Sequence, residues 1–268
     1  NELESSANER LNAVAEARKS ELSGYLRSIQ GDLVILAKNE LVRKALGDFD
    51  AGWKQMEEPE QTLKKLYIDE NPNPIGQKEN LDFADDGSSY SQAHAQYHPW
   101  FRDLLRDRDY YDIFLFNPSG DLVYSVFKEL DYATNLNEGQ WASSDLGNAF
   151  RMARDNPRDG HVTFLDFKPY APSHGAAASF ISTPIIEDGT LLGVFVFQMP
   201  IGKINEIMSR VNGLGETGET FLVGDDGLFR SAARFSKDAL LQAKAGSILL
   251  ESLKTSDAGM ATSDTYRE

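Results

Sequence analysis

A strand-turn-strand pattern occurs twice in this chain and constrains its fold more than any other feature. The first copy, FLFNPSGDLVYS, covers Phe114 to Ser125, and the second, FLVGDDGLFRS, covers Phe221 to Ser231. Each copy has an apolar run, a turn rich in Gly, Asn, Asp or Pro, and a second run that closes on Ser, which is typical of a β-hairpin. A hairpin repeated after about a hundred residues indicates two related modules in tandem, because solenoid repeats recur every ~20 to 50 residues.

The composition permits two modules and excludes several classes of function. The 268 residues are enough for two ordinary domains with a core each. With 42 acidic against 27 basic residues the net charge is −15, so we expect neither nucleic acid nor an anionic membrane surface as a partner. The chain has no cysteine, which excludes disulfides and Cys-ligated zinc. No apolar run is long enough to span a bilayer. Because the chain starts at Asn1, we interpret it as a piece of a longer protein.

The amino-terminal part predicts a long amphipathic helix. It contains no Pro as far as Leu46. A stripe that is apolar except for Arg18 recurs every three or four residues, at Leu11, Val14, Arg18, Leu22, Tyr25, Ile29, Leu33 and Leu36. One small domain cannot cover such a helix along its whole length. We therefore expect residues 1–47 to form a homodimer with a second copy of the chain. A helix that packs wholly within its own domain is the alternative.

The first module, residues 48–202, predicts a five-stranded antiparallel sheet. Residues 48–91 are mostly irregular, with a short helix at Gln61 to Tyr67, and His98 to Arg108 has helical character. Two strands, a helix and three strands follow, at Tyr111–Phe116, Leu122–Lys128, Ser143–Asp155, Val162–Phe167, Ala178–Ile186 and Leu191–Met199. This order indicates an α+β fold of the PAS-like type.

The second module predicts only part of such a sheet. Residues 203–214 indicate a linker helix with a hinge, and residues 215–268 contain the second hairpin and a helix at Lys237 to Lys254, without the last strands. The glycines at 213, 215 and 218 match G-x-G-x-x-G. However, they follow a helix and open a strand, which is the reverse of a dinucleotide site. We therefore expect a hinge there, and no cofactor.

Four stretches resemble a known family. They are DFKPYAPS at residues 166–173, SFISTPI at 179–185, GVFVFQMPIGKINEIM at 193–208 and GLGETGETFLVGDDGLFRS at 213–231. Together they resemble the double Cache, or tandem PDC, sensor domains of bacterial histidine kinases, chemotaxis receptors and membrane-anchored cyclases. The segment YDIFLFNPSGDLVYSVFKELDYATNL at 111–136 is also similar to that family.

The resemblance implies a periplasmic portion of an inner-membrane protein, attached through flanking membrane helices that this chain lacks. It also implies that the membrane-distal module, residues 48–202, holds the ligand and that the long helix dimerises. Trp100 and Arg102 do not follow the order and spacing of the amino-acid-binding subgroup, so we infer no amino-acid specificity.

Candidate ligand-binding residues come from the strands and from one loop of the first module. Alternation along the second strand selects Tyr124 for the concave face and places Lys128 on the same side. Lys128 is a candidate to neutralise a ligand carboxylate, and Asp131 to receive an ammonium group. Ordinary surface charges are the alternative for both.

An aromatic loop braced by two prolines supplies the remaining candidates. Its side chains Asp166, Phe167, Tyr170 and Ser173 combine the polar and aromatic groups of a small-molecule pocket, although Asp166 alone is equally suited to cap a turn. On the strand that faces this loop, Phe180 and Ser182 share one side, which we expect to line the cavity.

No catalytic or metal-binding constellation emerges from the sequence. His94 and His98 have helical metal-ligand spacing but no third ligand, so we predict surface histidines. We also expect no carboxylate in an apolar setting that shifts its pKa. The favoured interpretation is a sensor, not an enzyme, that binds an amino acid, an organic acid or an amine. An acid/base enzyme that uses Asp166 and Tyr170 and a structural spacer without a ligand are the alternatives.

Overall fold

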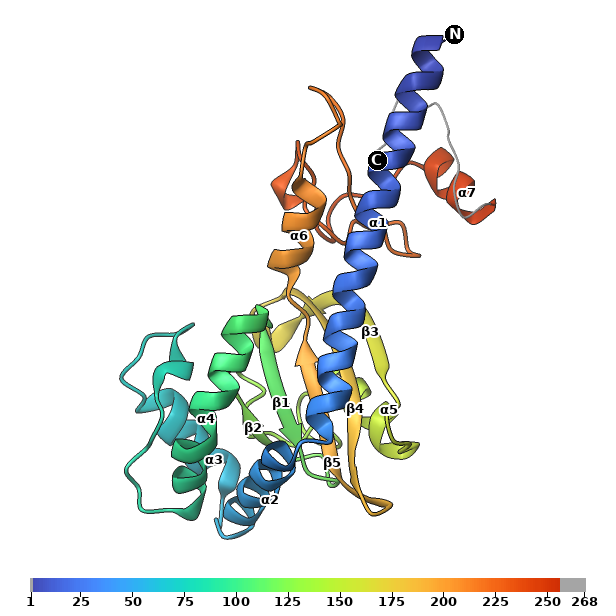
Figure 1. Cartoon of the computed structure of the whole chain (residues 1–268). Coiled ribbons are helices and arrows are strands. Elements are labelled where there is room, and N and C mark those ends of the chain that lie inside the picture. Colours follow the sequence, from blue (N-terminus) through green and yellow to red (C-terminus); the bar gives the residue numbers. More distant parts are fainter. Residues whose placement is uncertain (1, 256–268) are drawn as a thin grey trace. The chain divides into compact units, whose positions relative to one another are not determined.

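A computed structural model describes residues 2–255, which divide into two compact units (Figure 1). The sheet unit comprises Ser28–Pro200, and the terminal unit combines the chain up to Arg27 with the chain from Ile201 onward. Helix α1 (Glu2–Ala37) contributes residues to both units. Each unit is described by itself.

The sheet unit contains one five-stranded antiparallel sheet. Its strands are β1 (Asp112–Phe116), β2 (Leu122–Ser125), β3 (Thr163–Tyr170), β4 (Ala176–Glu187) and β5 (Thr190–Gln198). They lie in the order β2-β1-β5-β4-β3, so that β2 and β3 are the edges. The hairpin, helix and three strands follow the predicted order. This confirms the predicted α+β fold class.

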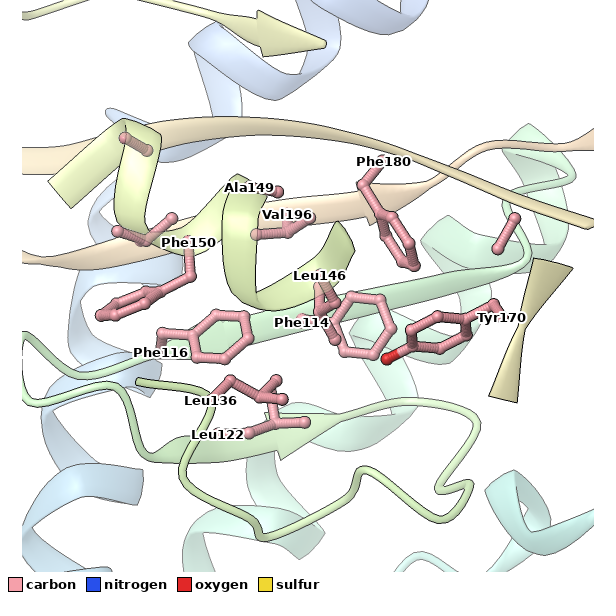
Figure 2. Close-up of a cluster of buried hydrophobic side chains, with 13 residues drawn as sticks. Phe114, Phe116, Leu122, Leu136, Leu146, Ala149, Phe150, Tyr170, Phe180 and Val196 are labelled. Carbon is pink, nitrogen blue, oxygen red and sulfur yellow. The ribbon is translucent and has the colours of Figure 1, made fainter. Parts of the chain in front are cut away.

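Helix α5 (Asp145–Asp155) packs on one side of the sheet, called here the α5 face. Phe150 of the helix lies 5.1 Å from Phe116 of β1, between ring centroids, within the cluster of buried side chains in Figure 2. Ser182 of β4 donates a hydrogen bond of 2.8 Å to the Ala149 carbonyl of the helix. Ser144 caps the helix, and its Oγ accepts the Gly147 N–H. The Ser182 hydrogen bond and the Phe150 contact thereby fix the middle of the helix to the sheet.

Helices α2 (Glu40–Lys54) and α4 (Ser89–Arg108) pack on the opposite side, called here the α4 face. Phe49 of α2 stacks on Tyr124 of β2 with ring centroids 4.6 Å apart, and Phe101 of α4 lies 5.0 Å from the same ring. Between these helices the chain forms α3 (Pro59–Lys64), a π-helical turn η1 (Lys65–Asp69) and a 3-10 turn η2 (Lys78–Asn80).

The predicted single helix to Leu46 is wrong, because the chain forms two helices there. Helix α1 ends at Ala37, and α2 begins at Glu40. Asn39 caps the second helix, since its Oδ1 accepts the Leu41 N–H at 2.8 Å. The break thus comes from an N-cap residue inside an otherwise helical pattern, with no Pro to mark it.

The terminal unit contains α6 (Ile201–Ser209), a 3-10 turn η4 (Lys237–Ala239) and α7 (Ser247–Thr255) in addition to its part of α1. The second hairpin motif forms its turn, with a single bridge between Val223 and Phe229. The predicted helix over 237–254 is wrong, because η4 and α7 are separate elements. Positions 256–268 of the predicted partial module lie outside the described residues. Among residues 2–255, no helix combines the length and apolar character needed to cross a membrane.

Gly193 in β5 has no room for a side chain. A Cβ there would lie 2.1 Å from the Phe116 carbonyl oxygen and 2.8 Å from a Leu46 methyl group. We expect Gly193→Ala to lower the free energy of unfolding by about 1–3 kcal/mol, because the end of β1 and helix α2 must both move away from β5. Gly47→Ala is the control: it lies in α2 with open space around it and should stabilise by up to about 1 kcal/mol. Urea unfolding followed by circular dichroism measures both, and equal effects would contradict this packing.

Candidate ligand-binding site

A pocket of about 550 Å³ opens on the α5 face of the sheet unit. Its walls come from the loop before α5, the first turn of that helix, the end of β3 with the 3-10 turn η3 (Ala171–Ser173), and β4. The lining residues are Gln140, Trp141, Ser143, Ser144, Asp145, Asn148, Lys168, Pro169, Tyr170, Ala171, Pro172, Ala178 and Phe180. The pocket thus combines aromatic rings with hydroxyl, amide and carboxylate groups, as small-molecule sites do.

A buried carboxylate lies directly behind the Tyr170 side chain. The Tyr170 hydroxyl donates a hydrogen bond of 2.7 Å to Asp131 Oδ2, while Asp131 Oδ1 is buried and has no hydrogen-bond partner among the described residues. Burial raises the pKa of Asp131 from 3.8 to about 7. Figure 2 shows the Tyr170 ring beside Phe114 and Phe180 in the core on this side.

A second buried carboxylate, Asp112, begins β1. Its Oδ1 accepts the backbone N–H groups of Ile113, Val126 and Phe127 at 2.7 to 3.0 Å, and its Oδ2 has no hydrogen-bond partner in the described chain. Burial raises the pKa of Asp112 well above its usual range. Gln198 stands opposite Asp112 on β5, and its side-chain oxygen is also buried without a described donor.

The α4 face holds a different polar cluster, which surrounds the ammonium group of Lys128. Its Nζ lies 5.5 to 5.7 Å from the ring centroids of Tyr67, Tyr124 and Tyr132, and it donates to the carbonyls of Ser125 and Val126. Burial lowers the pKa of Lys128 to about 7, while the rings and carbonyls favour the charged form. This cation has its partners within the protein.

Comparisons with known proteins agree on the kind of fold. No family model matches the chain. A probable chemoreceptor of Sinorhizobium fredii is 28% identical over 177 residues, which are 63% of this chain and 22% of that protein. The chain therefore spans about a fifth of that relative's length. The sensor domain of the Vibrio cholerae histidine kinase DctB aligns with a TM-score of 0.53 at 12% identity, over 90% of this chain and 70% of that one.

The chain has the fold of a bacterial sensor domain. The Pseudomonas aeruginosa amino acid chemoreceptor PctC, whose ligand-binding domain was solved with GABA, also aligns, with a TM-score of 0.47 at 16% identity over 87% of this chain and 77% of that one. The alignment with the DctB domain supports the resemblance to sensor domains that the sequence motifs carry.

The structure places the predicted ligand-binding residues on two faces of the sheet and not at one site. Tyr170 and Phe180 line the pocket, and Asp131 bonds to Tyr170 on that side. Tyr124 and Lys128 lie on the α4 face. The reason is a register shift: Phe116 pairs with Leu122, whereas Leu115 pairs with Tyr124, so one extra residue turns Tyr124 away from the α5 face.

The other predicted residues have structural partners outside the pocket. Asp166 and Phe167 belong to strand β3 and not to a loop, and Asp166 Oδ1 accepts the N–H of Phe167. Ser173 donates a short hydrogen bond to Glu129. Ser182 of β4 donates its hydrogen bond to the Ala149 carbonyl of α5. Of the nine candidates, only Tyr170 and Phe180 line the pocket itself.

Two predictions about titratable groups are wrong. His94 and His98 are fully buried rather than exposed, and their rings stack 4.2 Å apart. Because the Glu79 carbonyl can only accept, His98 Nε2 carries the proton at 2.7 Å, and Tyr124 donates to Nδ1 at 2.6 Å. Carboxylates in apolar settings also exist, at positions 112 and 131. Within the described chain, no three His, Asp or Glu side chains gather as a metal site.

Sequence reasoning missed the contribution of α5 to the pocket. Trp141, Asp145 and Asn148 lie just before the helix or in its first two turns, and they face the end of β3. The signal was present: polar and aromatic residues directly precede the Ser144 cap of a helix whose apolar face packs on the sheet.

The Asp131 carboxyl predicts a measurable pH dependence of stability. Tyr170, Asp112, Glu129 and Lys64 act on it. Because its folded pKa of about 7 exceeds its ordinary value of 3.8, the folded protein holds a proton that the unfolded chain has released. The free energy of unfolding contributed by Asp131 is therefore highest below pH 4 and falls as the pH rises to 7.

We expect Asp131→Asn to remove this fall. Urea unfolding should be measured at several pH values between 4 and 8. The free energy of unfolding of the wild type should exceed that of the variant by less as the pH rises, or fall below it. Glu138→Gln removes an exposed carboxylate of the same loop and controls for net charge. Parallel curves for wild type and Asp131→Asn would contradict a raised pKa.

Proposed function

We propose that the chain is the extracytoplasmic ligand-sensing domain of a bacterial transmembrane receptor, either a histidine kinase or a chemotaxis receptor. The sheet unit is the membrane-distal module, and it binds a small polar molecule, an amino acid, an organic acid or an amine, in the pocket beside α5. The single observation that carries this proposal is that pocket of about 550 Å³ between α5, β3 and β4. We place the domain in the periplasm, as part of an inner-membrane protein whose membrane helices flank this chain.

The relative from Sinorhizobium fredii, described as a probable chemoreceptor, supports a receptor. An acid/base enzyme is less well supported, because the Tyr170 hydroxyl donates to Asp131 rather than to Asp166, and Asp166 does not line the pocket. A structural spacer is less well supported too, since the interior beside α5 is hollow and polar.

Signalling requires a moving part, and we propose that the pocket closes on its ligand. Closure would draw the first turn of α5 toward the end of β3, which together form two of its walls. The displacement would then pass to the membrane helices through α1 or through the terminal unit.

The first test is a thermal-shift screen with amino acids, organic acids and amines. A ligand present at about 100 times its Kd stabilises the folded state by ~2.7 kcal/mol, which for a unit of this size raises Tm by about 5–10 °C. Ser143→Trp places a ring at the exposed mouth of the pocket and should abolish the shift. Gln92→Trp, exposed on α4, should leave it unchanged. A shift that survives Ser143→Trp would move the site elsewhere.

We also propose that α1 forms a homodimer. Leu3 and Leu11 in its first half are 79% and 45% exposed. A double Leu3→Asp and Leu11→Asp variant should sediment as a monomer at concentrations where the wild type is dimeric, because the charges would be buried in the helix pair. Asn12→Asp adds one charge on the same helix and serves as the control. Wild type and double variant with the same mass would refute a dimer through this face.

A further inference from the structure

Three buried oxygens on the α5 face have no hydrogen-bond partner among the described residues. They are Asp112 Oδ2, Asp131 Oδ1 and the side-chain oxygen of Gln198, and each residue is at most 1% exposed. Asp112 and Gln198 share the α5 face because they alternate in register with Phe114 and Val196 of its core. Asp131 reaches the same face through Tyr170.

These oxygens lie around one place in the fold. Gln198 pairs with Asp112 on one side and with Phe180 on the other. The Phe180 ring centroid is 5.0 Å from that of Tyr170, whose hydroxyl bonds to Asp131. Burial is the main cause of the raised pKa of Asp112, and the Asp131 carboxylate is close enough to add to it. The three oxygens are not part of the pocket lining; they lie behind Tyr170 and Phe180, which do line it.

Nearby side chains do not supply the missing donors. The Tyr170 hydroxyl already bonds to the other oxygen of Asp131, and Lys128 Nζ donates to the carbonyls of Ser125 and Val126. A buried acceptor without a donor costs about 1–3 kcal/mol, and an ionised one costs more. A bound group with several N–H donors and a positive charge would supply the missing hydrogen bonds and would also stabilise an ionised carboxylate.

The outer part of the pocket is also acidic and aromatic. Asp145 Oδ2 is buried without a hydrogen bond, and its ion-pair partner Lys168, 3.5 Å away, has a side chain that is 67% exposed. Rings of Trp141, Tyr170 and Phe180 line the space between the acidic groups. Aromatic faces favour cations and alkyl chains.

We infer that the pocket takes an aliphatic primary amine, whose ammonium group donates to Asp131, Asp112 and Gln198 while its carbon chain lies against Trp141, Tyr170 and Phe180. The inference rests on the proposed sensing function and names the ligand class of that site. A second ammonium group, in a diamine, would meet Asp145 at the mouth. We expect dicarboxylates not to bind, because they would bring further acceptors and negative charge to an acidic site.

Titration calorimetry tests the ligand class with four probes of matched length: butylamine, 1,4-diaminobutane, butanoate and succinate. We expect the two amines to bind and the two acids not to bind at 10 mM. Binding of an acid, blocked by Ser143→Trp, would overturn the amine class while the sensing function stands. If both amines fail at 10 mM, the inference is wrong whatever else binds. If neither these probes nor the wider screen gives a ligand, the proposed function itself fails.

Substitutions then test which carboxylates bind the ammonium groups of the probes. Asp131→Asn should weaken amine binding at least tenfold, and Asp145→Asn should weaken 1,4-diaminobutane more than butylamine. Asp155→Asn, an exposed carboxylate at the far end of α5, is the matched control and should bind as the wild type does. Far-ultraviolet circular dichroism verifies folding of each variant. Unchanged amine affinity in a folded Asp131→Asn variant would overturn the inner site.

The affinity should also depend on pH in a way that only an ionising partner explains. An alkylamine stays protonated between pH 6 and 8, whereas Asp131, acted on by Tyr170, Asp112, Glu129 and Lys64, loses its proton near pH 7. Wild-type affinity should be about tenfold weaker at pH 6 than at pH 8, because only the ionised fraction binds. Asp131→Asn should lose this dependence. A pH-independent wild type would contradict direct pairing with Asp131.

Discussion

A buried carboxylate at the start of β1 fixes the path of the segment that carries the polar groups of both faces. Asp112 accepts N–H groups from Val126 and Phe127, so it holds the chain where it leaves β2. Directly afterwards, Lys128 adopts a left-handed backbone with φ of 60°, which costs a non-glycine residue about 1–2 kcal/mol. This bend sends Lys128 to the α4 face and Asp131, three residues on, to the α5 face.

The two faces consequently differ in whether their buried polar groups have partners within the protein. On the α4 face, a positive group of the protein is surrounded by tyrosine rings and carbonyls, with two neutral histidines stacked beside it. Burial lowers the pKa of both imidazoles well below the ordinary value, so the cluster gains no further charge at neutral pH. On the α5 face, acceptors outnumber donors and a pocket adjoins them. The first face is internally satisfied, and the second has room and polarity for a ligand.

The order of strands along the chain and the α5 helix could be predicted from the sequence, because hairpin turns, alternation and helix-capping residues are local signals. The sequence could not predict which face Tyr124 occupies, since one extra residue between two paired positions reverses alternation and leaves no mark in composition. Burial of His94 and His98 was missed because it depends on the distant Glu79 and Asp82 carbonyls that receive their N–H groups. Sequence reasoning did place Tyr170 and Phe180 together in the lining of the pocket, because aromatic and Pro residues concentrate at the end of β3 and alternation along β4 selects Phe180.

The edge position of β3 has a consequence for how a molecule enters. One wall of the pocket is a strand bonded to β4 alone, and its register with β4 is interrupted between Leu165 and Lys168. Residues after this interruption, Pro169 and Tyr170 among them, pair with β4 alone, so displacing them outward would break the terminal hydrogen bonds of one ladder and leave the central three strands paired. An entering molecule would therefore displace the part of β3 that follows the irregular pairing, and the energy of this displacement is set by the last hydrogen bonds between β3 and β4.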